Sequence, residues 1–138
     1  MEISKIIASA EAENDGEMYT TTLKVHQHEM IADELAEFGG KDLGPAPGDY
    51  LCMAIASCQA ITLRMYVNRK KWQVDKIRVA VKLVKADQMP SGLNTFFCEI
   101  STTGAIDPEQ HKRLLEISKA CPIHRLLSKP SELVTTML

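Results

Sequence analysis

Aromatic side chains are scarce in this sequence, and it carries no surplus of positive charge. Only 5% of its 138 residues are Phe, Tyr or Trp, and its formal net charge is −2. Proteins that stack on single-stranded nucleic acid interleave aromatic with basic residues, and binding to phosphate backbones or anionic membranes requires a basic surface. We therefore expect neither nucleic acid nor a membrane among its partners.

The sequence also lacks an apolar run of the length that a signal peptide or a membrane span requires. Acidic residues occur within residues 1–14, and Gln59 and Arg64 interrupt the most apolar stretch. A cytoplasmic location is the resulting expectation. In a reducing compartment, we expect the four cysteines to have catalytic, metal-binding or packing roles rather than to form structural disulfides.

The size and composition of the chain are those of one globular domain. With 138 residues, 45% of them hydrophobic, residues 1–138 are predicted to fold as a single unit with a core of its own. The sequence contains no internal repeat, no glycine-rich phosphate loop and no serine nucleophile elbow. These absences argue against nucleotide chemistry and serine hydrolysis.

Alternation of apolar and polar residues predicts β-strands in three parts of the chain. The predicted strands cover residues 3–10, 18–28, 30–33, 77–83, 96–100 and 132–137. Turn-forming residues at 13–16 connect the first two strands. Strand groups separated by two helices predict an α+β domain.

The longer helix is predicted within residues 39–72, GGKDLGPAPGDYLCMAIASCQAITLRMYVNRKKW. A loop rich in Gly and Pro precedes it, and Asp49 is the expected residue at its N-terminus, where a carboxylate meets unpaired N–H groups. Apolar positions recur at spacings of three and four residues and predict one buried stripe. The stripe consists of Leu51, Ala54, Ile55, Cys58, Ile61, Thr62 and Met65.

The second helix has a clear start and a clear end. Asp107 is its predicted N-cap, Pro108 its first residue and Gln110 the partner in a capping box. The helix is expected to stop near Cys121, because Pro122 disfavours helical geometry in the residue before it. A short turn is expected after Pro122.

The four cysteines occupy different kinds of position. Cys98 alternates with apolar neighbours and is expected in the core, and Cys52 lies about 120° around the helix from Cys58, as a packing residue. Taken alone, Cys58 on an apolar helix stripe favours a structural role, since the helix dipole reaches little beyond the first turn. Cys121, held in a non-helical conformation before a proline, is compatible with a functional or a structural role.

Metal binding is an alternative use of some of the same residues. Cys121 and His124 have a Cys-x-x-His spacing, and His26 and His28 lie on one face of a predicted strand, so that the four residues form a candidate ligand set. Structural zinc sites are usually built from two tight pairs that include more cysteines, which favours a solvated strand face for His26 and His28. His124 either orients a thiol or caps the turn.

Two segments resemble the OsmC/Ohr family of osmotically induced and organic-hydroperoxide-resistance proteins. They are residues 39–72, quoted above, and the C-terminal SKACPIHRLLSKPSELVTTML, and the resemblance is most specific at ASC in the long helix and at ACPIHR. It covers nearly the whole chain and is closest to the OsmC-like branch, in which a Gly-Pro-x-Pro loop precedes the helix. The resemblance implies an OsmC-like α+β fold of antiparallel strands with a long central helix, assembled as an intertwined homodimer.

The resemblance also implies a thiol peroxidase that needs no metal, flavin or haem cofactor. Cys58 corresponds to the peroxidatic cysteine of the family and Cys121 to the resolving cysteine. The implied substrate is an organic peroxide, with hydrogen peroxide as a second candidate, and the implied reductant is an external dithiol. Oxygen transfer to Cys58 and condensation with Cys121 would give a disulfide.

One feature of the sequence departs from the family pattern. The best-studied branches place an arginine from an N-terminal strand beside the peroxidatic thiolate and hold it with a glutamate, but residues 1–63 contain no arginine, and Gly48 or Asp49 stands at the glutamate position. Lys24, His26 and Arg125, next to His124, are the candidate replacements. The departure favours the alternative function, a non-catalytic redox-sensing or small-molecule-binding domain of the same fold.

Overall fold

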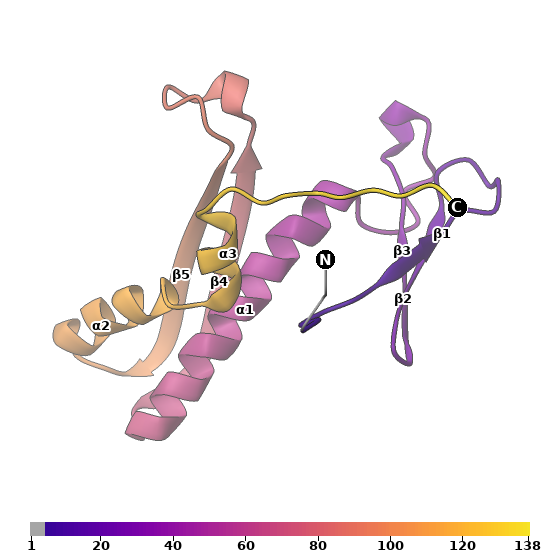
Figure 1. The fold of residues 1–138 in the computed structure, drawn as a ribbon. Helices are drawn as coiled ribbons and strands as arrows, with labels where there is room; N and C mark the ends of the chain where they lie inside the picture. The colour runs from indigo at the N-terminus through magenta and orange to yellow at the C-terminus, as the bar shows by residue number, and fades with distance from the viewer. Residues whose placement is uncertain (1–4) are drawn as a thin grey trace. The chain divides into compact units, whose positions relative to one another are not determined.

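The computed structural model describes residues 5–138, which separate into two compact units. The first extends to Tyr50 and the second begins at Leu51. Strands β1–β3 belong to the first unit, strands β4 and β5 and helices α2 and α3 belong to the second, and helix α1 begins in the first and continues through the second (Figure 1). The single domain expected for residues 1–138 stays a prediction.

The first unit contains a three-stranded antiparallel sheet. Its strands are β1 (Glu11–Glu13), β2 (Thr21–Val25) and β3 (His28–Ala32), in the spatial order β1-β2-β3. A two-residue turn joins β2 to β3, and His26 in this turn has a positive φ of 53°. The two β2 ladders run in register, with Leu23 opposite Ala12 on one side and Met30 on the other.

This hairpin corrects the strands predicted near the N-terminus. The predicted strand 18–28 ends at Val25, because the chain reverses at His26 and the next strand begins at His28. His26 and His28 therefore do not share a strand face. Of the predicted strand 3–10, residues 5–10 have no regular structure and residues 3 and 4 lie outside the described residues. The third predicted strand, 30–33, corresponds to β3.

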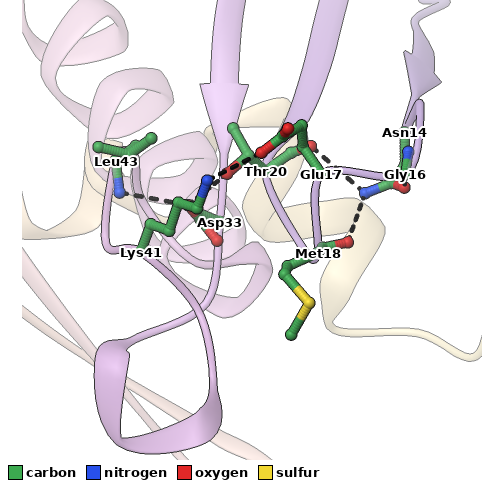
Figure 2. A network of polar contacts seen from close by, with 8 residues as sticks. All are labelled: Asn14, Gly16, Glu17, Met18, Thr20, Asp33, Lys41 and Leu43. Carbon is green, nitrogen blue, oxygen red and sulfur yellow. Dashed lines mark hydrogen bonds and ion pairs between the residues drawn. The ribbon is translucent and has the colours of Figure 1, made fainter.

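A buried carboxylate fastens the end of β3 to the loop that follows it. Asp33 is 2% exposed and accepts hydrogen bonds from the Thr20 hydroxyl at 2.8 Å and from the backbone N–H groups of Glu34 at 2.7 Å and Leu43 at 3.3 Å. Figure 2 shows Asp33, Thr20 and Leu43 beside the exposed ion pair of Lys41 with Glu17. The short 3-10 helix η1 (Ala36–Phe38) lies within the loop that Asp33 anchors.

Helix α1 (Pro47–Lys70) begins two residues earlier than predicted. Pro47 is its first residue, and the Asp49 carboxylate accepts the backbone N–H of Ala46 at 3.0 Å, as in the reciprocal half of a capping box. At the other end Lys71 adopts a positive φ of 58°, and the N–H of Trp72 bonds to the carbonyl of Val67 at 3.0 Å. These contacts form a Schellman motif that terminates the helix.

The fully buried residues of α1 share only Ile55 with the stripe that the sequence predicted. They are Ile55, Gln59, Leu63, Tyr66 and Val67. Of the predicted stripe, Ile61 is 55% exposed and Met65 is 68% exposed. Apolar residues surround most of the helix, so their spacing does not select one face; the face that β4 and α2 cover is the one that becomes buried.

The length and composition of α1 satisfy a test for membrane-spanning helices, contrary to the expectation based on Gln59 and Arg64. A core helix of a soluble protein passes the same test. Leu63 and Val67 of α1 are completely buried, in the core of the second unit. Packing within the protein therefore accounts for the apolar character of this part of the helix.

The sheet of the second unit is a long antiparallel hairpin. Strand β4 (Gln73–Val84) pairs with β5 (Thr95–Ala105), and the 3-10 helix η2 (Ala86–Gln88) lies in the connection. The register shifts between Val74 and Lys76, and Gly104 faces Val74 with a φ of +130°. A Cβ at Gly104 would approach the carbonyl oxygen of Gln73 to 2.1 Å, so glycine is required where the bulge tightens the hairpin.

Two helices follow β5. Helix α2 (Pro108–Ser118) has the predicted capping box between Asp107 and Gln110, with Pro108 as its first residue. The predicted turn after it is instead a further helix, α3 (Pro122–Leu127), which Cys121 caps. Residues of α1, β4 and α2 form the core of the second unit, namely Leu63, Tyr66, Val67, Val74 and Leu114.

The strand predicted at residues 132–137 does not form. Residues 130–138 have no regular secondary structure, and Leu133 is 88% exposed. A strand needs a neighbour that completes its hydrogen-bond ladder, and within the described chain β4 and β5 pair only with each other. The observed elements nevertheless confirm the α+β class, with antiparallel sheets and a long helix.

Candidate functional site

The fold of the second unit brings together two thiols that are 63 residues apart in sequence. Cys58 lies within α1 and is partly buried, and Cys121, directly before α3, is 0% exposed. Both are free thiols, and they lie close enough for the Cys58 thiol to raise the pKa of Cys121. This proximity makes the pair a candidate site for thiol–disulfide chemistry.

The start of α3 determines the surroundings of Cys121. Pro122 is the first residue of the helix, and Cys121 serves as its N-cap, with its Sγ accepting the backbone N–H of His124 at 3.5 Å. Burial raises the pKa of the Cys121 thiol, and the hydrogen bond with Cys58 raises it further, against the lowering effect of the His124 and Ile123 N–H groups. Cys121 therefore keeps its proton at neutral pH.

His124 and Arg125 contact Cys121 through the backbone. The Arg125 N–H donates to the carbonyl of Cys121 at 3.1 Å, while its side chain is exposed and that of His124 is half-buried. Sequence reasoning singled out the side chains of these residues and missed their amides. The signal was present, since a cysteine directly before proline, at the start of a helix, is an N-cap position.

The remaining predicted site residues belong to the first unit. Lys24 is an exposed residue of β2, His26 lies in the turn after it, and the Asp49 carboxylate is engaged with the backbone at the start of α1. Cys58 belongs to the second unit. The roles expected for Lys24, His26 and Asp49 beside Cys58 remain predictions.

The geometry gives no support to the metal-binding alternative. Across residues 5–138, no group of three or more His, Cys, Asp or Glu side chains is arranged to hold a metal ion. Two of the four proposed ligands, His26 and His28, are separated by the reversal of the chain described above.

Cys98 was predicted to be a core residue, and that prediction is wrong. Its side chain is exposed, as are those of its neighbours Phe97 and Glu99. Two cavities of about 400 and 350 Å³ adjoin it, and the smaller is also lined by Gln59. The partial cover that the thiol retains raises the pKa of Cys98, and the nearby Gln59 side chain opposes this effect.

Comparison with known proteins identifies the family. The model of the OsmC-like protein family matches residues 39–136, and no curated protein matches the chain. The structure is similar to that of an OsmC-like protein from Mycoplasma pneumoniae, with 18% identity, a TM-score of 0.72 and coverage of 91% of this chain and 89% of the other.

Two further solved structures carry names that refer to organic hydroperoxides. An organic hydroperoxide resistance protein, OsmC, from Legionella pneumophila has 15% identity and a TM-score of 0.61, with 89% of this chain and 91% of the other covered. An organic hydroperoxide resistance protein from Elizabethkingia anophelis has 18% identity and a TM-score of 0.63, with 91% and 90% covered. At such identities the likeness establishes the fold, and the family model, which matches more than half of the sequence, establishes that the chain belongs to the OsmC-like family.

Proposed function

We propose that this protein is a thiol-dependent peroxidase that reduces organic hydroperoxides. The observation that carries the proposal is the proximity of the free thiols of Cys58 and Cys121, which is close enough for Cys58 to raise the pKa of Cys121. Membership of the OsmC-like family supports a redox function related to peroxides. No metal or organic cofactor takes part in the proposed reaction.

The proposed reaction has three steps. The Cys58 thiolate attacks the terminal oxygen of the hydroperoxide, the O–O bond breaks, and the alkoxide leaves as an alcohol after taking a proton, so that Cys58 becomes a sulfenic acid. The Cys121 sulfur then attacks the Cys58 sulfur and releases water, which forms the disulfide. An external dithiol reduces this disulfide and is itself oxidised to a disulfide.

Cys121 suits the second step because its proton stays on the sulfur until it is needed. Its raised pKa favours the neutral thiol in the reduced protein, so the pair does not hold two adjacent negative charges while Cys58 reacts. The hydroxyl that leaves the sulfenic acid requires a proton, and the Cys121 thiol supplies it.

Stabilisation of the Cys58 thiolate is assigned to residues other than an N-terminal arginine. We place Lys24, His26 and Arg125 in this role, with Asp49 and His124 as supporting residues, since residues 1–63 contain no arginine. Lys24 and His26 would act from a strand and its turn, and Arg125 from α3, directly after His124. Single substitutions to Gln at Lys24, His26 and Arg125 are expected to rank these contributions through the rate of Cys58 oxidation.

A homodimer is part of the proposal. α1 exposes the apolar side chains of Leu51, Ile61 and Met65, which favour contact with another protein surface over contact with water. We propose that a second copy of the chain covers them. The net charge of −2 supports a protein without nucleic-acid or membrane partners, and a cytoplasmic location would provide the reducing conditions that the cycle needs.

A turnover assay tests the function. Cumene hydroperoxide and hydrogen peroxide are supplied with dihydrolipoamide or dithiothreitol as the dithiol, and peroxide consumption is followed over many equivalents of protein. We expect turnover with the organic peroxide, its abolition in Cys58→Ser, and its retention in the control Cys52→Ser. Unchanged activity in Cys58→Ser, or the absence of turnover in the unaltered protein with either dithiol, contradicts the proposal.

The absence of arginine from residues 1–63 favours one second candidate, a redox-sensing domain that does not turn over. Such a domain would form the Cys58–Cys121 disulfide once and would be reduced slowly. The same assay separates the two functions, because the sensing domain consumes about one equivalent of peroxide and then stops.

A further inference from the structure

Three positively charged side chains gather around one buried tyrosine ring in the second unit. Tyr66 of α1 is 6% exposed. The guanidinium carbon of Arg69 lies 5.4 Å from the centroid of its ring, and the ammonium nitrogen of Lys70 and the guanidinium carbon of Arg113 each lie 5.8 Å from it. Because all three charges surround the same ring, they are close neighbours of one another.

Helix geometry accounts for two of these cations but not for the third. Arg69 and Lys70 belong to the last turn of α1, where side chains three and four residues after Tyr66 meet its ring and the helix dipole favours positive charge. Arg113 comes from the middle of α2, so the tertiary fold adds a charge to a place that is already positive. Each cation is attracted to the aromatic ring, but the three repel one another.

Most hydrogen-bond donors of these three side chains are unused. In the described part of the chain, the side chains of Arg69 and Lys70 take part in no hydrogen bond or ion pair, and both residues are exposed. Arg113 donates its Nε–H to the Tyr66 hydroxyl at 3.1 Å and an Nη1–H to the Glu116 carboxylate at 2.8 Å. These two bonds orient the guanidinium group, and its Nη2 is left over.

The charges of this cluster do not balance. Across the described residues, Glu116 is the only acidic side chain that forms an ion pair with any of the three cations, so two positive charges remain unmatched. An anion with two or more negative charges would restore the balance. Guanidinium groups suit phosphate oxygens in particular, because their planar N–H groups can bind two oxygens at once.

We propose that Arg69, Lys70 and Arg113 form a binding site for a small molecule that carries a diphosphate group. The Nη2 of Arg113 would bind one phosphate, and Arg69 and Lys70 would bind the other. A long polyanion such as nucleic acid is a poorer match, since it needs many phosphate contacts over a wide basic surface, whereas this chain has a net charge of −2. The site does not depend on reaction at Cys58.

Trp72 makes binding at this site observable. It is the only tryptophan of the chain, and its ring centroid lies 5.3 Å from that of Tyr66, so its fluorescence should change when an anion binds beside that ring. The full-length protein is titrated with pyrophosphate, orthophosphate and sulfate at constant ionic strength, and calorimetry measures each affinity. We expect pyrophosphate to bind roughly tenfold or more tightly than the other two, because its second phosphate adds charge-assisted hydrogen bonds.

Substitutions in α2 identify the residues that bind the anion. Arg113→Gln should weaken pyrophosphate binding roughly tenfold or more, and Arg113→Lys should weaken it less, because the charge remains but the planar fork is lost. Glu116→Gln should tighten binding, since it removes the competing carboxylate. Lys112→Gln is the matched control: it removes one exposed positive charge from the same helix, but Lys112 is not among the cations at the ring, so the affinity should change little.

If Arg113→Gln fails to fold, Arg69→Gln provides the same test from α1. Three results would overturn the proposal. They are the absence of pyrophosphate binding at millimolar concentrations, equal losses of affinity in Arg113→Gln and Lys112→Gln, and tighter binding of hexaglutamate than of pyrophosphate. The second result would mean that overall charge governs binding, and the third would assign the cluster to an acidic segment of a protein partner.

Discussion

The thiol of Cys121, buried directly before α3, lies close enough to the thiol of Cys58 on α1 for Cys58 to raise its pKa. The two thiols are neighbours in the reduced protein, so the partner that would form a disulfide with Cys58 is already near it. Pro122 fixes this arrangement, because it starts α3 and leaves Cys121 as the N-cap with its sulfur turned toward the backbone N–H of His124.

One equivalent of cumene hydroperoxide is expected to produce a disulfide between Cys58 and Cys121 within one chain. The two thiols are close enough for Cys58 to raise the pKa of Cys121, and a disulfide requires such proximity. Peptide mapping under non-reducing conditions identifies the linkage, and a denaturing gel should show a chain that migrates as a monomer. Cys52→Ser is the control and should give the same product; a disulfide between chains, or two free thiols after oxidation, would refute the pairing.

The raised pKa of Cys121 predicts how stability depends on pH. An unfolded thiol loses its proton near its ordinary pKa of 9.0, whereas folded Cys121 holds its proton to higher pH. The stability that this contributes is complete below pH 9.0 and is lost as the pH rises through the higher pKa of the folded state. Urea unfolding between pH 7 and pH 10 should therefore show a decline in the free energy of unfolding.

Cys121→Ala should make this decline shallower. Ser57→Ala, a change on the exposed side of α1, should leave the slope unaltered, which makes it the matched control. If Cys121→Ala has the same slope as the unaltered protein, the Cys121 thiol does not contribute to the pH dependence of the free energy of unfolding.

The sequence predicted those elements whose signals are local. The capping box of Asp107 and Gln110, the interruption at Pro122 and the Gly/Pro loop before α1 each depend on neighbours within a few residues, and the structure contains all three. The meeting of Cys58 with Cys121 was expected from the resemblance to a family, because no spacing within the chain encodes a contact between residues so far apart.

Features that depend on tertiary packing could not be predicted in the same way. The apolar residues of α1 surround the helix, so only the positions of β4 and α2 determine that Leu63 is buried and Met65 is exposed. Cys98 has the alternation of a core residue, but in the fold it is exposed. The unpaired Oε1 acceptor of Gln59 has no sequence signal, because it depends on the absence of a hydrogen-bond donor on the described elements that surround it.

Gly104→Ala should destabilise the second unit strongly. Its φ of +130° is unfavourable for residues with a Cβ, and the added carbon would lie 2.1 Å from the carbonyl oxygen of Gln73. We expect a loss of about 3 kcal/mol or more in the free energy of unfolding, measured by urea denaturation.

The matched control for this substitution is Gly48→Ala, in the first turn of α1, where an added Cβ meets no atom within 4 Å. There alanine should stabilise the protein by about 0.5–1 kcal/mol, because it is the better helix former. Equal effects at the two positions would contradict the assignment of strain to the β4–β5 bulge.

Asp33→Asn should weaken the first unit and remove part of its sensitivity to acid. Burial alone would raise the pKa of this carboxyl, but hydrogen bonds from Thr20, Glu34 and the loop that contains Leu43 outweigh it and hold the pKa below its ordinary value of 3.8 (Figure 2). The stabilisation is therefore complete above pH 3.8 and is lost as the pH falls through the lower pKa of the folded state. Asparagine presents one acceptor oxygen where the carboxylate has two, so one of the donors loses its partner, and the melting temperature at pH 7 should fall by several degrees.

Glu17→Gln, which breaks only the exposed ion pair with Lys41, should change the melting temperature little, because exposed ion pairs are weak. Thermal unfolding followed by circular dichroism from pH 7 to pH 2 checks both variants: a melting temperature of Asp33→Asn that equals that of the unaltered protein at pH 7 would show that the carboxylate does not anchor the loop.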